Sequence, residues 1–193
     1  AGTVRNCAGG VTPWGTWVTC EEVNDEPEPN AEQPHGYNFE VMPSATPGLV
    51  EPVALKAMGR FRHEAIAVDQ ASGCVYQTED VGDGLLYRFV PANPGRLAEG
   101  GRLEALVVRD RFTVDTRNWE VADFPAGRPL PVDWVEVDGV DNPDNDLRRR
   151  GAAAGAALFA RGEGAWWGHD SAYFAMTNGG LRRLGQIFRY RPS

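Results

Sequence analysis

Short apolar runs, separated by glycine, proline and polar residues, recur along the whole chain. Runs rich in β-branched and aromatic residues and bounded by turn residues are typical of strands. The pattern predicts nine strands, at residues 16–20, 37–41, 66–69, 74–78, 85–90, 103–108, 134–137, 172–176 and 186–190. Only residues 145–160, rich in Ala, Arg and Leu, favour a helix, and Gly151 and Gly155 weaken that prediction.

A weak internal repeat connects these strands. Each copy has an aromatic strand, a polar turn and a second strand with alternating aromatic residues; the copies begin near residues 16, 74 and 172. The stretch 103–137 is interpreted as a more degenerate copy. Steps of about 50 residues are typical of propeller blades. We therefore predict an all-β fold, with residues 1–193 forming a single β-propeller domain of about four blades in an incomplete ring. A β-sandwich is the alternative.

The net charge of the chain and the length of its apolar runs limit which partners the protein can have. The 193 residues carry a formal net charge of −8, which disfavours nucleic acid as a partner because duplex binding relies on basic side chains. No apolar run reaches the roughly 18 residues of a membrane helix, so no membrane partner is expected, and we expect a monomer. The chain has neither a signal peptide nor an initiator Met, and we interpret it as an internal fragment of a longer protein.

The first candidate motif covers residues 6–22. Its Gly9-Gly10 pair allows the backbone to approach a neighbouring strand or a ligand closely. Glu21 and Glu22 would point to opposite sides of a continued strand. One of them could then face a metal ion while the other fixes a neighbour, although a hairpin followed by an acidic turn explains the same residues.

Two further motifs combine acids with strand ends. Residues 59–65 place His63 and Glu64 before an apolar run. Residues 78–84 hold three acids and two glycines, as in an oxygen-donor loop for calcium, but without the spacing of an EF-hand. Solvated, charged turns are the alternative for both.

A fourth motif, residues 159–164, holds Arg161 and Glu163 on one face of an extended segment. Arginine is the side chain best suited to bidentate phosphate binding, while a structural ion pair is the alternative. The acidic stretch 141–146 is interpreted as an exposed loop or a helix cap.

Taken in this order, the motifs resemble the PhoX family of alkaline phosphatases. The residues that carry the resemblance are 6–22, 59–65, 75–80, 86–89, 159–164 and 185–190. The resemblance implies a bacterial β-propeller enzyme, periplasmic or secreted in its full-length form, that hydrolyses phosphomonoesters with iron (Fe3+) and calcium (Ca2+). It also implies further blades outside this chain, so we expect weak or no activity from this stretch alone.

The resemblance also implies roles for individual residues. Cys7 would be a thiolate ligand of iron, and Arg161 would be the catalytic residue that holds the substrate phosphate. The carboxylate ligands in the same cluster would be Glu21, Glu22, Glu64 and Glu163. From motif position we add Glu79 and Asp80 as metal ligands. Cys7 must then be free rather than bridged to Cys20.

This residue set is chemically coherent. Calcium prefers oxygen ligands, and a thiolate suits a transition metal. Metal ions can neutralise phosphoryl oxygens and activate an oxygen nucleophile, with Arg161 as a clamp on the phosphate. We therefore predict a metal-dependent phosphatase for small-molecule phosphate esters. The alternatives are a non-catalytic, calcium-stabilised propeller acting as a binding scaffold, which needs neither a thiolate nor Arg161, and a hydrolase of another ester such as a lactone.

Overall fold

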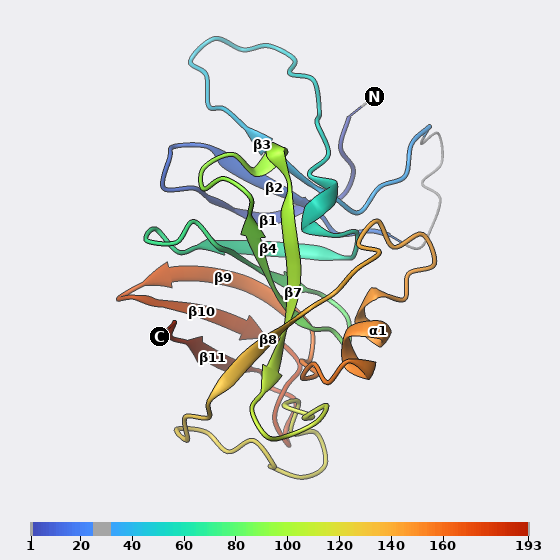
Figure 1. Ribbon diagram of the computed structural model, residues 1–193, viewed down its shortest axis with the longest axis vertical. Helices are drawn as coiled ribbons and strands as arrows, with labels where there is room; N and C mark the ends of the chain where they lie inside the picture. The colour runs from blue at the N-terminus through green and yellow to red at the C-terminus, as the bar shows by residue number, and fades with distance from the viewer. Residues whose placement is uncertain (1, 25–31, 193) are drawn as a thin grey trace.

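Strands dominate the structure, a computed structural model that describes residues 2–24 and 32–192 (Figure 1). The strands are β1 (Asn6–Val11), β2 (Trp17–Glu21), β3 (Asn38–Val41), β4 (His63–Val68), β5 (Val75–Glu79), β6 (Leu86–Pro91), β7 (Gly101–Val108), β8 (Val132–Glu136), β9 (Gly162–Gly168), β10 (Ser171–Met176) and β11 (Gln186–Tyr190). One sheet has the order β3-β2-β1-β4-β5-β6-β7-β8, and a second has the order β11-β10-β9. The helical elements are α1 (Leu147–Ala153) and two 3-10 turns, Lys56–Met58 and Leu97–Glu99.

All nine predicted strands are confirmed, with ends that move by three residues at most. Two strands, β1 and β9, were not predicted, because their sequences NCAGGV and GEGAWWG contain glycines that lower strand propensity. In β1 the glycines are needed for packing: a Cβ on Gly10 would lie 2.5 Å from the carbonyl oxygen of Ile66 in β4. The close contact of the two backbones requires glycine, and glycine weakens the strand pattern in the sequence.

The described residues form three antiparallel units. The first unit is β1–β3, the second is β4–β8, and the third is β9–β11. The stretch 103–137 was predicted to be a further copy of the repeat, and that prediction is wrong. It supplies β7 and β8, which extend the second unit because β7 pairs with β6.

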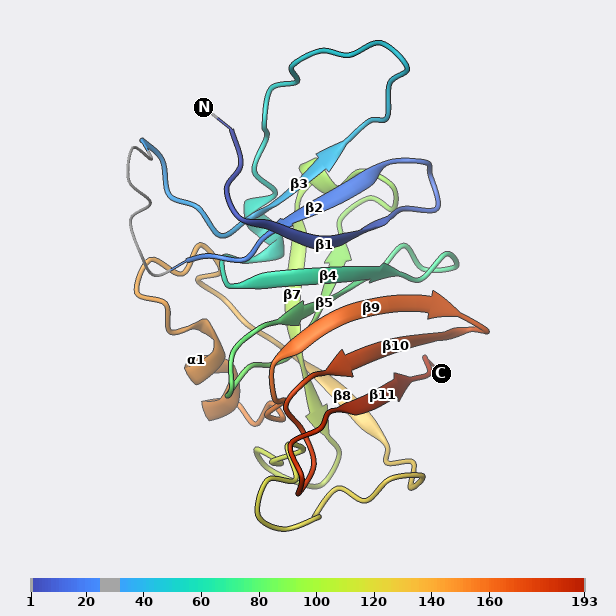
Figure 2. The ribbon, with the colours of Figure 1, turned by 180° about the vertical axis from the view of Figure 1, so that it is seen from behind.

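The first strands of the three units lie next to one another and run in the same direction (Figure 2). β1 pairs in parallel with β4 through Gly9 and Ala65, and β4 packs against β9. Each unit extends away from this line of strands. The starts of β1, β4 and β9 therefore lie along one side of the molecule.

Two buried clusters hold the units together. Val18, Phe61 and Tyr87 belong to a cluster shared by the first and second units. Tyr76 belongs to the other cluster, which lies between the second and third units. Its ring stacks on that of Trp167, with ring centres 6.1 Å apart. Because these aromatic side chains bury large apolar areas, the positions of the units relative to one another are fixed by packing.

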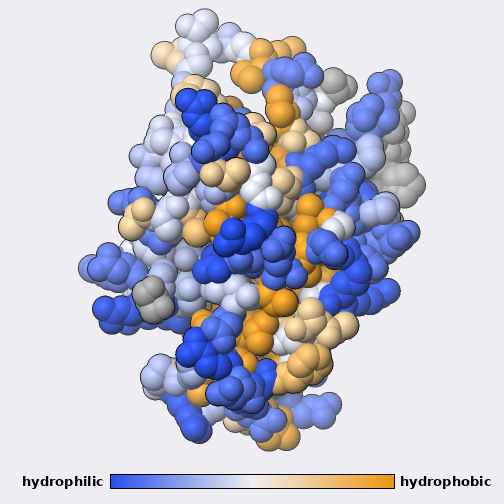
Figure 3. Space-filling model, viewed as in Figure 1, coloured by the Kyte–Doolittle hydropathy of each residue, from blue (hydrophilic) through white to orange (hydrophobic). Residues whose placement is uncertain are grey.

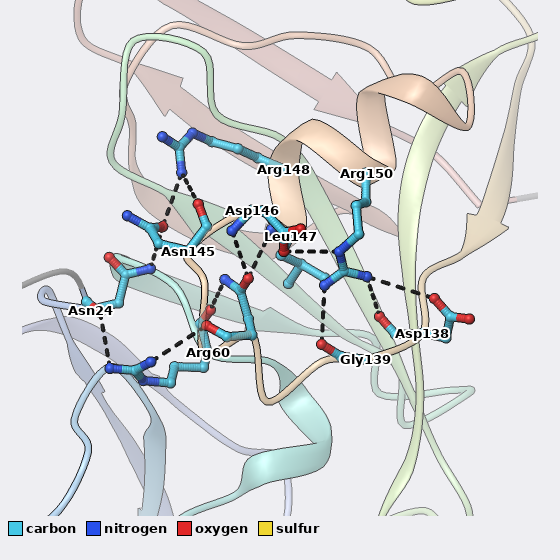
Figure 4. Close-up of polar contacts among 10 residues, drawn as sticks. Asn24, Arg60, Asp138, Gly139, Asn145, Asp146, Leu147, Arg148 and Arg150 are labelled. Carbon is cyan, nitrogen blue, oxygen red and sulfur yellow. Dashed lines mark hydrogen bonds and ion pairs between the residues drawn. The ribbon is translucent and has the colours of Figure 1, made fainter.

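The helix is shorter than predicted. Instead of residues 145–160, α1 covers Leu147–Ala153, and the chain turns at Gly155, which has a φ of 103°. Asn142 accepts hydrogen bonds from the backbone N–H groups of Asp146 and Leu147 through its Oδ1. The stretch 141–146 thus includes a cap for α1. Arg150 reaches back to the carbonyl groups of Asp138 and Gly139, which ties the preceding loop to the helix (Figure 4).

The face shown in Figure 3 is mostly hydrophilic, with hydrophobic residues exposed between the polar ones. One apolar group, Leu49, Val50 and Val53, lies on the long loop between β3 and β4. Among the described residues, no helix has both the length and the apolar character needed to span a membrane.

Candidate metal centre

Three residues with metal-binding side chains meet where β1 and β4 begin. The Cys7 sulfur and one carboxylate oxygen each of Glu22 and Glu64 all lie within 4.8 Å of one another. Cys7 is the second residue of β1, Glu64 is the second residue of β4, and Glu22 directly follows β2. Below, we call these three residues the Cys7 cluster.

Repetition of the fold builds this cluster. The second residue of the first strand is Cys7 in the first unit, Glu64 in the second and Glu163 in the third. Because these strands are adjacent and run in the same direction, equivalent residues reach the same side of the molecule (Figure 2). The charge of Glu163 acts on Glu64, which places the third unit beside the cluster.

The residue after the second strand of each unit also faces this region. These residues are Glu22, Asp80 and Thr177. Each donates its backbone N–H to the carbonyl of the arginine that precedes the first strand of its own unit, over N–O distances of 3.1, 3.0 and 3.0 Å; the arginines are Arg5, Arg62 and Arg161. In all three units the same backbone hydrogen bond thus holds the end of the second strand next to the start of the first strand.

Arg161 is held firmly beside the cluster. Its Nε and Nη2 donate to the two carboxylate oxygens of Asp80 at 2.8 and 2.7 Å, and Nη2 lies 3.4 Å from Glu163. Its backbone has a φ of 54° and is fixed on both sides, by hydrogen bonds to Val81 and from Thr177. Nη1 makes no hydrogen bond within the described part of the chain, so one edge of the guanidinium is available to a ligand.

Burial, followed by the crowding of acidic groups, raises the pKa values in the Cys7 cluster. Burial, followed by the hydrogen bond and charge of Glu64, raises the pKa of the Cys7 thiol to about 11. Burial, together with the charges of Glu163, Glu22 and Asp80, raises the pKa of Glu64 to about 7, although the hydrogen bond with Cys7 acts in the opposite direction. The pKa of Glu22 is also raised, by burial and then by Asp80. A bound cation would reverse these shifts by favouring the charged forms.

Glu21 points away from the cluster, as strand alternation predicts for a neighbour of Glu22. Its buried carboxylate accepts hydrogen bonds from the backbone N–H groups of Val4, Gly36 and Tyr37, and it also contacts His35. Glu21 therefore fixes the neighbouring backbone in this structure, and its assignment as a metal ligand stays a prediction.

The acids of residues 78–84 do not converge on one point. Glu79 is fully buried, and its Oε2 accepts hydrogen bonds from the Leu85 N–H and the Tyr87 hydroxyl. Asp80 binds Arg161, and Asp83 pairs with Arg148 at 3.0 Å. The structure thus gives no shared calcium loop in this stretch. The ligand assignments of Glu79 and Asp80 stay predictions.

Sequence reasoning missed Thr177, Arg5 and Arg62. Thr177 Oγ1 lies 3.3 Å from the Glu163 carboxylate, which identifies it as a neighbour of the site. The signal in the sequence was an arginine shortly before each first strand, but it could not be used while β1 and β9 were unassigned. Cys7 and Cys20 are directly opposite in the β1–β2 register and form no disulfide with each other, and Cys74 is also free.

The neighbours Glu21 and Glu22 offer a matched test. In the metal-free protein, Glu21→Ala should lower the free energy of unfolding by about 3 kcal/mol or more, because three backbone N–H groups lose their acceptor at about 1 kcal/mol or more each. Glu22→Ala should change it by less than about 1 kcal/mol. In calcium titrations, Glu22→Ala should weaken binding by at least about tenfold. Urea denaturation would measure the free energy of unfolding, and calorimetry would measure the calcium affinity. Equal destabilisation by the two changes, with unchanged calcium affinity in Glu22→Ala, would contradict the separate roles of Glu21 and Glu22.

The reactivity of Cys7 tests its coupling to Glu64. Because the thiolate is the reactive form and the pKa of Cys7 is about 11, alkylation of the metal-free protein by iodoacetamide should be slow at pH 8 and accelerate up to about pH 11. Glu64→Gln removes a negative charge that raises this pKa and leaves a weaker, neutral acceptor for the thiol, so the midpoint should fall. Mass spectrometry would locate the modified residue. Glu99→Gln, which changes an exposed carboxylate paired with Arg96, is the control, and an unaltered midpoint in Glu64→Gln would refute the coupling.

Comparisons with known proteins bear on this arrangement. A search of curated proteins finds no match. A solved structure, Pseudomonas fluorescens PhoX in complex with vanadate, a transition state analogue, is similar in fold with a TM-score of 0.65 and 23% sequence identity. The similarity covers 100% of this chain and 45% of that one, so this chain spans less than half of the length of the solved protein. The family profile described as alkaline phosphatase PhoX matches residues 1–193, and the chain therefore belongs to the PhoX alkaline phosphatase family.

Proposed function

We propose that the protein containing this chain is a metal-dependent phosphatase that hydrolyses phosphomonoesters at the Cys7 cluster. The observation that carries the proposal is the meeting of a thiol, several carboxylates and a guanidinium, from three separate units, at one side of the fold. Membership of the PhoX family supports it. So does the solved PhoX structure, which is a complex with vanadate, a transition state analogue.

The residues present fit a mixed metal site. Three donor atoms lie within 4.8 Å of one another. Burial, followed by the neighbouring acidic groups, raises the pKa values of Cys7 and Glu64, and a bound cation would favour their charged forms. We assign Cys7 to iron, since a thiolate suits a transition metal, and Glu22, Glu64 and Glu163 to iron and calcium. When bound, the metal ions would neutralise phosphoryl oxygens and increase the acidity of the attacking water.

Arg161 would bind the phosphoryl group and stabilise the charge that its oxygens carry during the reaction. Asp80 occupies Nε and Nη2, which fixes the plane of the guanidinium, while Nη1 remains available. A donor that is already oriented costs no reorganisation during the reaction. Beside their predicted roles as metal ligands, Asp80 orients Arg161 through two hydrogen bonds. Glu21 accepts hydrogen bonds from the backbone before β1, and Glu79 from the backbone before β6.

The two alternatives fit the cluster less well. A calcium-stabilised binding scaffold needs oxygen ligands but has no use for a thiol hydrogen-bonded to Glu64, or for a guanidinium fixed by a buried acid. A lactone is uncharged, so its hydrolysis does not call for a cationic clamp of the kind that suits phosphate. The composition of the site therefore favours a phosphate ester.

The architecture supports a propeller. Antiparallel units whose first strands lie side by side, as β1, β4 and β9 do, have the arrangement of propeller blades. We interpret the three units as adjacent blades of a larger propeller. Export to the periplasm or the medium, a monomeric state and the low activity of this stretch alone stay predictions.

The proposal predicts a large effect of Arg161 on catalysis. With p-nitrophenyl phosphate, iron and calcium, the full-length protein should show turnover that chelators abolish. Arg161→Gln should lower kcat/KM by about 10²–10³-fold, as expected for the loss of an oriented donor to the transition state. Arg96→Gln, which removes an exposed arginine paired with Glu99, is the control. Full activity in Arg161→Gln, or turnover of carboxylate esters with none of phosphate esters, would contradict the proposal.

A further inference from the structure

An arginine stands directly before the first strand of every unit. Arg5 precedes β1, Arg62 precedes β4 and Arg161 precedes β9. All three accept the same backbone hydrogen bond, from Glu22, Asp80 and Thr177 respectively. The three arginines are therefore structurally equivalent, although only Arg161 has a role in the site described so far.

The side chain of Arg161 shows what this position does. Its guanidinium reaches back to Asp80, which follows the second strand of the preceding unit. Arg62 stands in the same relation to Glu22, which follows the second strand of the first unit. The charge of Arg62 acts on Glu22, where it opposes the increase in pKa caused by burial and by Asp80. Arg62 thus extends its charge towards the Cys7 cluster.

Arg62 differs from Arg161 in one respect. The Nε of Arg161 donates to Asp80, whereas the Nε of Arg62 is buried and has no hydrogen-bond acceptor among the described residues. A buried donor without an acceptor is unfavourable, and more so when the group is charged. Nε itself is too buried for a ligand to reach. Nη1 and Nη2 of Arg62 make no hydrogen bond within the described residues and are not among the buried atoms, so they are the donors that a ligand can reach.

The segment that carries Arg62 is rigid. Arg60 donates from its guanidinium to the carbonyl groups of His35 and Asn24, as Figure 4 shows for Asn24. The backbone N–H of Phe61 bonds to the Gly36 carbonyl, and the Phe61 ring lies against His63 with ring centres 3.6 Å apart. Arg62 lies between these fixed residues, so its backbone cannot move freely to find another partner for Nε.

We propose that Arg62 is a second phosphoryl-binding residue, which donates from its Nη groups to an oxygen of the bound phosphate on the Glu22 side of the site. This inference rests on the proposed function. The ligand class is a tetrahedral oxyanion, either the phosphoryl group of a monoester or free orthophosphate. Arg62 and Arg161 both contact Asp80, Arg62 through its backbone carbonyl and Arg161 through its guanidinium. The two arginines come from neighbouring units, and each would bind a different oxygen of one anion.

Orthophosphate binding provides the test. In the metal-loaded, full-length protein, isothermal titration calorimetry should show that Arg62→Gln weakens orthophosphate binding by about tenfold or more, since a lost charge-assisted hydrogen bond is worth about 1.5–3 kcal/mol. Arg62→Lys, which keeps the charge but loses the planar donor group, should recover only part of the affinity. Metal content and the midpoint of thermal unfolding should remain at wild-type values. Arg102→Gln, which removes an arginine from a surface ion pair on β7, is the control for net charge.

The possible results separate this inference from the proposed function. Unchanged orthophosphate affinity in Arg62→Gln overturns the inference, and so does a loss of affinity that accompanies a loss of metal, because Arg62 would then serve only to position Glu22. A wild-type protein that binds orthophosphate but hydrolyses no phosphate ester overturns the proposed function, and the affinities of the Arg62 variants still decide the role of Arg62. A wild-type protein that does not bind orthophosphate overturns both.

Discussion

The close parallel contact between β1 and β4 is the constraint on which the site depends. Gly10 allows it, because a Cβ there would lie 2.5 Å from the Ile66 carbonyl oxygen. With the two strands in contact, their second residues, Cys7 and Glu64, come close enough to form a hydrogen bond. A wider spacing would separate the thiol from the carboxylate and leave each of them a separate surface group. The chemistry of the Cys7 cluster thus depends directly on the backbone packing of β1 against β4.

Charge balance explains why the same region would bind metal ions. The described chain brings several acids to one side of the fold, and burial makes their ionised forms unfavourable. Arg161 neutralises Asp80 through two hydrogen bonds, which leaves the Cys7 cluster as the part with surplus negative potential. A site with this surplus, and with both sulfur and oxygen donors, favours cations of mixed type. The arginines at its edge then favour an anionic ligand of those cations.

The sequence was sufficient to predict the strands with strong apolar alternation and the family resemblance, but not the strands that form the centre of the fold. β1 and β9 are rich in glycine, so propensity misses the two strands that carry Cys7 and Glu163. The alternation of side chains along a strand correctly predicted that Glu21 and Glu22 point to opposite sides, because this alternation depends only on the local backbone. The separate partners of Glu79, Asp80 and Asp83 could not be predicted, since they depend on Arg148 and Arg161, which are distant in sequence. The stretch 103–137 shows the same limit. Its strand β7 pairs with β6, and this pairing depends on the tertiary fold, which a repeat pattern in the sequence does not specify.

The central claim is that strand starts from separate units build one metal centre with sulfur and oxygen ligands. Iron K-edge X-ray absorption on the metal-loaded, full-length protein tests it most directly. The structure predicts a sulfur scatterer in the first coordination shell of iron, which disappears in Cys7→Ser and persists in Cys20→Ser and Cys74→Ser. A wild-type spectrum with only oxygen and nitrogen ligands, identical to that of Cys7→Ser, would contradict the account.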